Sequence, residues 1–222
     1  LLTFLLAGLS KAAEAGDWVR QNPELEGEKL NAVWTLDGSF AAAVGDNGTI
    51  YHYNGTSWTA QSSPTTANLN AVWGTGSTDV WAVGDYDSLI GGPNVLRWDG
   101  SSWSVVSGLP VVSADLYGAW IDSSSKNFFA VGSSGSIIRC DYSSVVTCYD
   151  ETSAATTTAN LKAVHGLSDS NVWAVGEYDS SQAQSAIVQR TSGVWNFVGT
   201  GSLSPSPSGV LKGAWTTEYN AY

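Results

Sequence analysis

Short apolar runs recur along the chain, and clusters of turn residues separate them. The most regular run has the pattern Leu-x-Ala-Val-Trp or a close variant, and it starts at Leu30, Leu69, Leu116, Leu161 and Leu211. These starts lie 39, 47, 45 and 50 residues apart. The runs are rich in β-branched and aromatic residues, and Asn-Gly or Asp-Gly pairs follow several of them. This alternation is typical of short strands joined by tight hairpins.

Each repeat is expected to contain four strands. In the second repeat they are 69–73, 79–84, 95–98 and the segment around Trp103. A period of about 40–50 residues with four short strands per unit is the signature of a β-propeller. The sequence therefore predicts an all-β fold, with a propeller of four full blades and one partial blade over residues 16–222.

The two ends of the repeat region each match part of a further blade. Gly16–Arg20 resembles a fourth strand, and Leu211–Tyr222 resembles a first strand and half of a second. A propeller commonly closes by building one blade from both termini, and here that shared blade would lack its third strand. Either the natural protein continues past Tyr222 with more blades, or the missing strand comes from elsewhere. An open sheet edge is an aggregation hazard, which favours continuation. The chain contains 11 Trp residues, and those that recur in every repeat are expected to pack between blades.

Residues 1–15 form a separate apolar segment, which we expect to be a short helix. Two interpretations remain open. The segment can be the end of a secretory signal peptide, because Ala13-x-Ala15 is a typical cleavage pattern. Alternatively it is an assembly helix that other copies bury, an arrangement that resembles type IV pilin-like subunits in outline. The apolar stretch is too short to span a bilayer. The side chains expected to make polymer contacts are Leu1, Leu2, Phe4, Leu5, Leu6 and Leu9.

The net charge disfavours nucleic acid as a partner. The chain has 9 Lys and Arg against 20 Asp and Glu, a formal charge of −11, whereas phosphate backbones require a basic face. The abundance of small polar residues is expected of an exported protein at the cell surface.

Two further features fit an extracellular location. Cys140 and Cys148 are expected on consecutive strands of one blade, where they can form a disulfide in an oxidising compartment; two buried free thiols are the alternative. Asn47 and Asn54 each begin an Asn-Gly-Thr sequon in a turn and are candidate glycosylation sites.

Two loops after the second strands break the repeat. Asp85-Tyr86-Asp87 and Glu177-Tyr178-Asp179 match each other, whereas the first and third units have shorter loops. Acidic loops of this kind can hold Ca²⁺ through carboxylate oxygens, but a solvated acidic turn is the other interpretation. We expect no other cofactor.

Motifs for catalysis are absent from the sequence. It contains no Gly-x-Ser-x-Gly elbow, no His-Glu-x-x-His and no phosphate-binding loop. A glycosidase needs two carboxylates across a cleft, and the pattern places the two acidic loops in alternate blades. We therefore expect a protein that is not an enzyme.

The pattern over Leu69–Trp103 resembles exported prokaryotic propeller repeats. These are loosely related to BNR/sialidase-like and photosystem II assembly factor-like propellers, and the resemblance covers residues 16–222. It implies a propeller fold, and it implies little about function because one fold serves many functions. No repeat carries the Asp-box of sialidases.

Three functions are compatible with these patterns. The first is an extracellular structural or adhesive subunit that associates with itself, and it is the one the sequence favours. The second is a module that binds surface glycans, with Tyr86 and Tyr178 stacking on sugar rings. The third is a glycoside hydrolase with catalytic residues beyond Tyr222.

Overall fold

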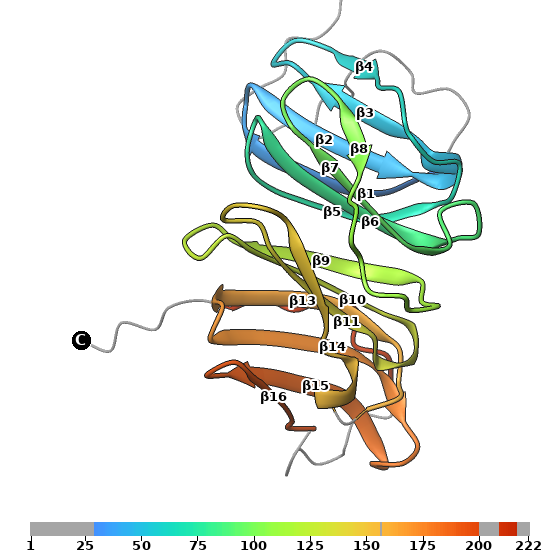
Figure 1. The fold of residues 1–222 in the computed structure, drawn as a ribbon, viewed down its shortest axis with the longest axis vertical. Helices are drawn as coiled ribbons and strands as arrows, with labels where there is room; N and C mark the ends of the chain where they lie inside the picture. The colour runs from blue at the N-terminus through green and yellow to red at the C-terminus, as the bar shows by residue number, and fades with distance from the viewer. Residues whose placement is uncertain (1–28, 156, 200–208, 217–222) are drawn as a thin grey trace, which may run out of the picture.

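The computed structural model describes residues 29–155, 157–199 and 209–216 (Figure 1). Several predicted features lie outside the described residues. They are the helix over 1–15 with its candidate assembly side chains Leu1, Leu2, Phe4, Leu5, Leu6 and Leu9, the fourth strand at 16–20, and the end of the predicted partial blade at 217–222.

The described residues form four antiparallel sheets of four strands each, and the strands of every sheet follow in chain order. We call these sheets blades 1 to 4. Blade 1 contains β1 (Leu30–Asp37), β2 (Phe40–Gly45), β3 (Ile50–Tyr53) and β4 (Trp58–Ala60); blade 2 contains β5 (Leu69–Gly76), β6 (Asp79–Asp87), β7 (Gly92–Trp98) and β8 (Trp103–Val105). Blade 3 contains β9 (Leu116–Asp122), β10 (Asn127–Gly132), β11 (Ile137–Asp141) and β12 (Thr147–Asp150); blade 4 contains β13 (Leu161–Ser168), β14 (Asn171–Asp179), β15 (Gln184–Thr191) and β16 (Val194–Phe197). Three short 3-10 turns complete the structure: η1 (Asp46–Gly48), η2 (Ser133–Gly135) and η3 (Thr152–Ala155).

The four blades stack face to face in chain order and fan outward from one side (Figure 1). The first strands β1, β5, β9 and β13 are neighbours along the inner side of the fan, and the fourth strands lie outside. The prediction of a β-propeller with four complete four-stranded blades is confirmed.

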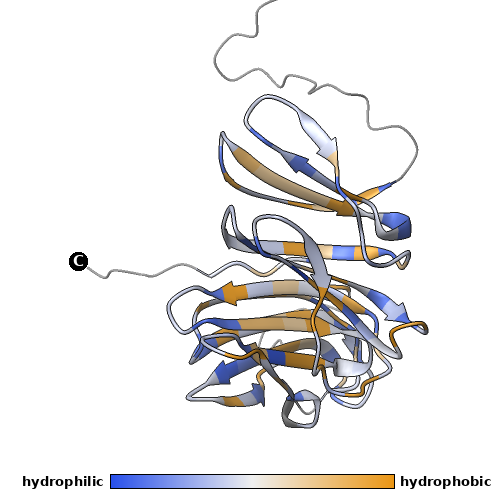
Figure 2. Ribbon diagram, turned by 45° about the horizontal axis from the view of Figure 1, so that its top comes forward, coloured by the Kyte–Doolittle hydropathy of each residue, from blue (hydrophilic) through white to orange (hydrophobic). Residues whose placement is uncertain are grey.

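Each middle blade uses both of its faces. In β6, Val80 and Ala82 pack toward blade 1, whereas Trp81 and Val83 pack toward blade 3. Side chains alternate between the two faces of a strand, so a strand buried on both faces reads as a continuous apolar run. The hydropathic colouring agrees, because the strands carry orange stretches whereas blue segments lie mostly toward strand ends and loops (Figure 2). Among the described residues, the three core clusters therefore coincide with the three contacts between consecutive blades.

The aromatic residue of each first strand points to the next blade. The ring of Trp34 lies over Gly74 of blade 2, and the ring of Trp120 lies over Gly166 of blade 4. His165 replaces this aromatic residue in blade 4 and contacts Thr216 through a 2.8 Å hydrogen bond. Gly74, Gly166 and Thr216 occupy the same repeat position. Each directly follows the residue that aligns with Trp34, namely Trp73, His165 and Trp215.

The prediction of a first strand beginning at Leu211 is wrong. The sequence predicts a first strand there, but residues 209–216 form no strand. The segment nevertheless lies where the first strand of a following blade is expected, because the backbone N–H of Leu211 donates to the carbonyl of Gly176 and Trp215 stacks on His165 at 4.4 Å. The prediction fails because the described residues include no second strand beside this segment to form a ladder with it.

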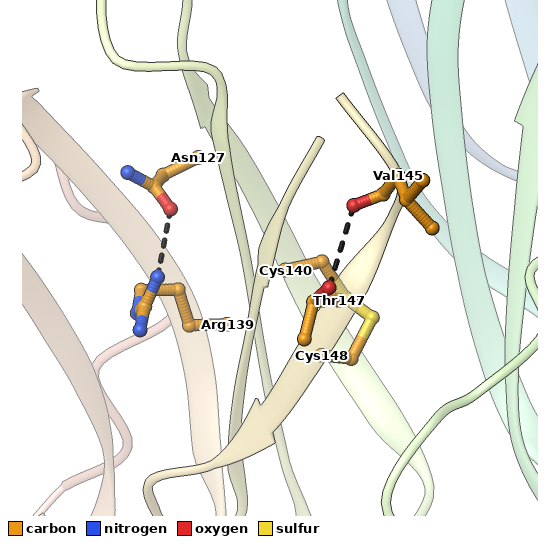
Figure 3. Close-up of a disulfide and its surroundings, with 6 residues drawn as sticks. All are labelled: Asn127, Arg139, Cys140, Val145, Thr147 and Cys148. Carbon is orange, nitrogen blue, oxygen red and sulfur yellow. Dashed lines mark hydrogen bonds between the residues drawn. A yellow bond between two sulfur atoms is a disulfide. The ribbon is translucent and has the colours of Figure 1, made fainter. Parts of the chain in front are cut away.

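The predicted disulfide is present. Cys140 on β11 lies directly opposite Cys148 on β12, and the two sulfur atoms are bonded (Figure 3). Cys140 faces the core between blades 2 and 3. The bond therefore ties the outer edge strand of blade 3 to its core.

Reduction of the disulfide is predicted to lower the free energy of unfolding by about 2.5 kcal/mol, because the bond closes a short loop in the unfolded chain. Urea denaturation with and without dithiothreitol measures this. The Cys140→Ala/Cys148→Ala variant is the control, since the reductant should not change its midpoint.

A close backbone approach explains the Gly that follows Ala-Val in the second strand of every blade. A Cβ added at Gly84 would lie 2.0 Å from the backbone carbonyl oxygen of Asn68, and Gly45, Gly132 and Gly176 meet the equivalent carbonyl at 2.0–2.1 Å. The residue before each first strand thus lies flush against this Gly, and only glycine fits there.

Gly84→Ala is predicted to destabilise the fold by about 3 kcal/mol, because backbone has to move to relieve the clash. The matched control is Gly76→Ala in the same blade, where an added Cβ meets nothing within 4 Å. Thermal denaturation of the two variants compares them; equal losses would contradict the close approach.

Candidate functional site

The topology collects two kinds of loop on one side of the molecule. The four strands of each blade run antiparallel in chain order. The hairpin between the second and third strands is therefore on the same side of the blade as the linker from the fourth strand to the next blade. The hairpins between second and third strands therefore lie beside the linkers 61–68, 106–115 and 151–160. We call this side the loop face. It contains Asn47 and both predicted acidic loops.

Asp87 and Asp179 are buried hydrogen-bond acceptors beneath the loop face. Asp87 accepts from the hydroxyl of Thr65 at 2.8 Å and from the backbone N–H of Leu89 at 2.8 Å. Asp179 accepts from the hydroxyl of Thr157 at 2.5 Å, and from the hydroxyl and backbone N–H of Ser181 at 2.6 and 2.8 Å. Each carboxylate thus fastens a hairpin to the preceding linker.

These hydrogen bonds also hold the two carboxylates in the charged form. The Thr65 hydroxyl and the Leu89 N–H lower the pKa of Asp87. Burial works against ionisation of Asp179, but the bonds from Ser181 and Thr157 outweigh it and lower its pKa to about 2. Their oxygens already accept from protein donors, which favours a structural role for the two carboxylates over binding of calcium. The described residues contain no cluster of three or more His, Cys, Asp or Glu side chains that could hold a metal.

Asp85 and Glu177 point in a different direction, toward the first strands. Asp85 accepts from the side-chain amides of Asn68 at 2.9 Å and Asn70 at 2.8 Å. Glu177 pairs with Lys162 at 3.0 Å, and the ammonium of Lys162 lies 3.8 Å from the ring centre of Tyr117.

Tyr117 of blade 3 lies close enough to both acidic loops for the charges of Asp85 and Glu177 to act on its hydroxyl. Burial raises the pKa of the Tyr117 hydroxyl, and the negative charges of Asp115, Asp85 and Glu177 raise it further. Asp85 and Glu177 are thus both near Tyr117, but each is engaged in its own hydrogen bond or ion pair.

A repeated hydrogen bond joins consecutive blades on this face. The backbone N–H of Tyr86 donates to the carboxylate of Asp115 in the next blade at 2.9 Å. The N–H groups of Asn47 and Ser134 make the equivalent bonds to Asn68 and Asn160, both at 3.0 Å. The loop face is therefore a continuous surface in which each hairpin is held by its neighbour.

The remaining predicted site residues are exposed. Tyr86 and Tyr178 lie on the surface of separate blades. Asn47 is exposed on η1 of the loop face, whereas Asn54 is exposed on the opposite side, in the β3–β4 turn. Both sequons are accessible, and their glycosylation stays a prediction.

The most exposed apolar side chains of the loop face were not singled out from the sequence. Leu89, at the tip of the β6–β7 hairpin, is 89% exposed, and Val111 in the linker from blade 2 to blade 3 is 94% exposed. For Leu89 the sequence does contain a distinguishing pattern. Leu89-Ile90 is an apolar pair in a loop whose counterpart in blade 4 is the polar pair Ser181-Gln182.

Two hollows flank this hairpin. The larger one, about 400 Å³, is lined by 90–93 of the hairpin and 105–111 of the linker, and the segments contain no charged residue. The smaller one, about 240 Å³, lies between the hairpin and 63–66, with Asp87 at its base. We call the hairpin and its two hollows the blade 2 groove.

None of the helical turns in the described part of the chain has the length and hydropathy of a membrane-spanning helix.

Comparison with solved structures supports the propeller fold. The chain is similar to the computationally designed protein Ika8 (TM-score 0.58, 11% identity, covering 85% of this chain and 53% of Ika8). It is also similar to YCF48 bound to D1 peptide (TM-score 0.50, 14% identity, 78% and 53% covered). A third similar structure is the extracellular domain of the putative hybrid two-component system BT3049 from Bacteroides thetaiotaomicron (TM-score 0.53, 12% identity, 76% and 24% covered).

These identities show the fold alone. The chain spans about half the length of Ika8 and YCF48, and about a quarter of the third structure. No protein-family model matches the sequence, and no curated protein matches it either.

Asp179→Asn is predicted to destabilise the protein in a pH-dependent way. The pKa of this carboxyl is about 2 in the folded protein against an ordinary value of 3.8. Near neutral pH the ionised group therefore contributes roughly 2 kcal/mol. Below about pH 4 the unfolded chain binds the proton first, so this contribution falls as pH drops toward 2.

Urea denaturation at several pH values measures the difference in free energy of unfolding between wild type and Asp179→Asn. Asp150→Asn, at an exposed position, is the control. A difference that does not change with pH would contradict the assignment.

Proposed function

We propose that this chain is a non-enzymatic, extracellular β-propeller that binds a partner protein through the blade 2 groove. The observation that carries the proposal is an uncharged hollow of about 400 Å³ with the exposed Val111 in its lining, beside the exposed Leu89 at the tip of the same hairpin, which lines the smaller hollow. Exposed apolar surface beside a concave, uncharged site is typical of a binding surface. An extended apolar peptide segment of the partner fits this chemistry.

The surroundings of the groove favour binding with little rearrangement. The hydroxyl of Thr65 links the side chains of Asn94 and Asp87, at 2.9 and 2.8 Å, and so fixes the base of the hairpin. A preorganised loop loses less conformational entropy when a peptide binds. The similar YCF48 structure is a complex with a peptide, which is a precedent for peptide binding by a protein of this fold.

Two observations support the extracellular location. Disulfides persist mainly in oxidising compartments, and Cys140–Cys148 is a disulfide. One of the similar structures is the extracellular domain of a larger protein. An adhesive or structural surface subunit is the role that combines this location with a protein-binding groove.

The non-enzymatic part of the proposal rests on how the acidic groups are used. Asp85, Asp87 and Asp179 accept hydrogen bonds from protein donors, and Glu177 accepts one from Asn160 while it pairs with Lys162. Side chains occupied in this way support loop structure, not proton transfer to a substrate. Filament formation through Leu1, Leu2, Phe4, Leu5, Leu6 and Leu9 stays a prediction.

Glycan binding is the second candidate. Tyr86 and Tyr178 are both exposed, as stacking on sugar rings requires. Neither tyrosine lines the two hollows beside the β6–β7 hairpin, so the geometry favours the peptide.

A panning experiment with a displayed dodecapeptide library tests the proposal. Wild type is expected to enrich apolar, uncharged sequences. Leu89→Asp is expected to lose that enrichment, because it places a charge at the tip of the hairpin that separates the two hollows, next to Ile90, which lines both.

Val145→Asp is the matched control, since Val145 is an equally exposed apolar residue in the β11–β12 hairpin, away from the groove. The control should enrich the same peptides as wild type. Enrichment that survives in Leu89→Asp, or no enrichment at all, would contradict the groove as a peptide site.

A further inference from the structure

The contact between blades 3 and 4 contains a polar cluster whose groups are all paired. Glu151 directly follows β12, and its carboxylate accepts from the indole N–H of Trp195 at 2.8 Å. Arg139 of blade 3 and Arg190 of blade 4 pair with the same carboxylate at 2.8 and 3.3 Å. The indole thus has its acceptor, and the two guanidinium groups balance the charge of that acceptor.

Gln61 of blade 1 is the counterpart of Glu151. Each directly follows a fourth strand, and its backbone N–H donates at 2.9 Å to the carbonyl of the residue that begins the third strand, Ile50 or Ile137. The side chain of Gln61 turns the other way. Its amide nitrogen donates to the hydroxyl and the carbonyl of Thr59 in its own blade, at 3.2 and 3.4 Å.

The indole of the next blade is therefore left without its acceptor. Trp103 is the counterpart of Trp195, because each lies opposite the same position of its third strand. A buried indole usually has a hydrogen-bond partner, and Trp103 is only 8% exposed. Yet its N–H has no acceptor among the described residues.

A hollow of about 210 Å³ lies at this place, between blades 1 and 2 in the upper half of Figure 1. It is lined by Gln61, Ser62, Trp98, Ser101, Ser102 and Trp103. The hydroxyls of Ser62 and Ser102 make no hydrogen bond within the described part of the chain. The hollow thus combines two indole rings with unpaired neutral polar groups, and its lining contains no charged residue.

The surroundings of the hollow favour a neutral acceptor over a carboxylate. Trp98 occupies the position that Arg190 has in blade 4. His52 occupies the position that Arg139 has in blade 3, and it lines a small adjoining cavity with both indoles. Burial lowers the pKa of His52, so the imidazole is neutral near pH 7. A carboxylate here would lack the two cations that balance Glu151.

We propose that this hollow binds one neutral sugar unit, free or at the end of a glycan, and that Trp103 donates its indole N–H to an oxygen of that sugar. Sugar hydroxyls both donate and accept, so they can also pair with Ser62, Ser102 and the amide of Gln61. Aromatic walls with a few placed polar groups are typical of a small-ligand site.

This site is separate from the surfaces discussed above. It shares no lining residue with the two hollows of the blade 2 groove. Neither Tyr86 nor Tyr178, the tyrosines singled out from the sequence for sugar stacking, lines it. The proposal therefore does not depend on peptide binding.

Saturation-transfer NMR titration with a panel of neutral methyl hexopyranosides tests the proposal, with glucuronate as the charged comparison. Wild type is expected to bind at least one neutral sugar, and to bind glucuronate at least about tenfold more weakly, since a buried carboxylate would have no counter-charge. A glycan array presents the same sugars at chain ends. Binding of the free glycoside shows that one unit suffices, whereas binding to the array alone assigns the site to a glycan end.

Ser102→Trp is expected to abolish binding, because the new indole fills the hollow. Ser102 is exposed, so this variant should fold normally. Ser57→Trp is the matched control: Ser57 has the same position in the β3–β4 turn of blade 1 and does not line the hollow. Leu89→Asp should also bind the sugar like wild type.

Trp103→Phe tests the hydrogen bond itself. The variant keeps an aromatic ring but loses the N–H, so sugar binding should weaken about tenfold. Urea denaturation checks that the variant is folded, and Ser102→Trp tests the hollow whatever the stability of Trp103→Phe. No binding of any neutral sugar in either arm, equal binding by Ser102→Trp and Ser57→Trp, or equally tight binding of glucuronate would each overturn the proposal.

Discussion

The structure depends on the packing of one blade against the next. Each sheet has apolar side chains on both faces, so a single blade cannot bury its own core. Trp81 and Val83 need blade 3, just as Val80 and Ala82 need blade 1. Stability in such an array is close to a sum of neighbour contacts, and within the described residues blades 1 and 4 each pack against a single neighbouring blade.

Polar contacts reinforce the same blade-to-blade arrangement. Glu151 of blade 3 accepts hydrogen bonds from Arg139 in its own blade and from Trp195 of blade 4, both at 2.8 Å, and it pairs with the buried Arg190 of blade 4 at 3.3 Å. On the loop face, Asp115 receives the N–H of Tyr86 from the preceding blade. These contacts fix the relative position of neighbouring hairpins, which is what turns separate loops into one rigid surface.

The repeat allowed the fold to be predicted closely, because packing is what the repeated residues encode. The Leu-x-Ala-Val-Trp runs at Leu30, Leu69, Leu116 and Leu161, the Ala-Val-Gly strands and the Cys140–Cys148 pair lie where the pattern placed them. The Gly in Ala-Val-Gly is required by a backbone contact that recurs in every blade. Leu211–Thr216 differs because a first strand needs a second beside it, and a sequence pattern does not show whether that partner is in place.

The candidate site was harder to predict because its residues break the repeat. The sequence left Asp87 and Asp179 as calcium ligands or parts of a solvated acidic turn, whereas both are buried and accept from Thr65 and Thr157, 22 residues earlier. Both threonines lie in linkers, four residues before a first strand, and the strand repeat carries no information about linkers. Val111 carries no charge and no aromatic ring, so nothing in the sequence pattern distinguishes it from a buried apolar residue until its exposure is known. Leu89 is distinguished only by the apolar pair that it forms with Ile90 in a loop.

The central claim is that an outward blade face is stabilised only when a neighbouring blade covers it. Hydrogen–deuterium exchange of the full chain tests it most directly. The account predicts that amides of β9, which blade 2 covers, are protected far more strongly than those of β1, whose outward face no described blade covers. Equal protection of these two first strands would contradict it.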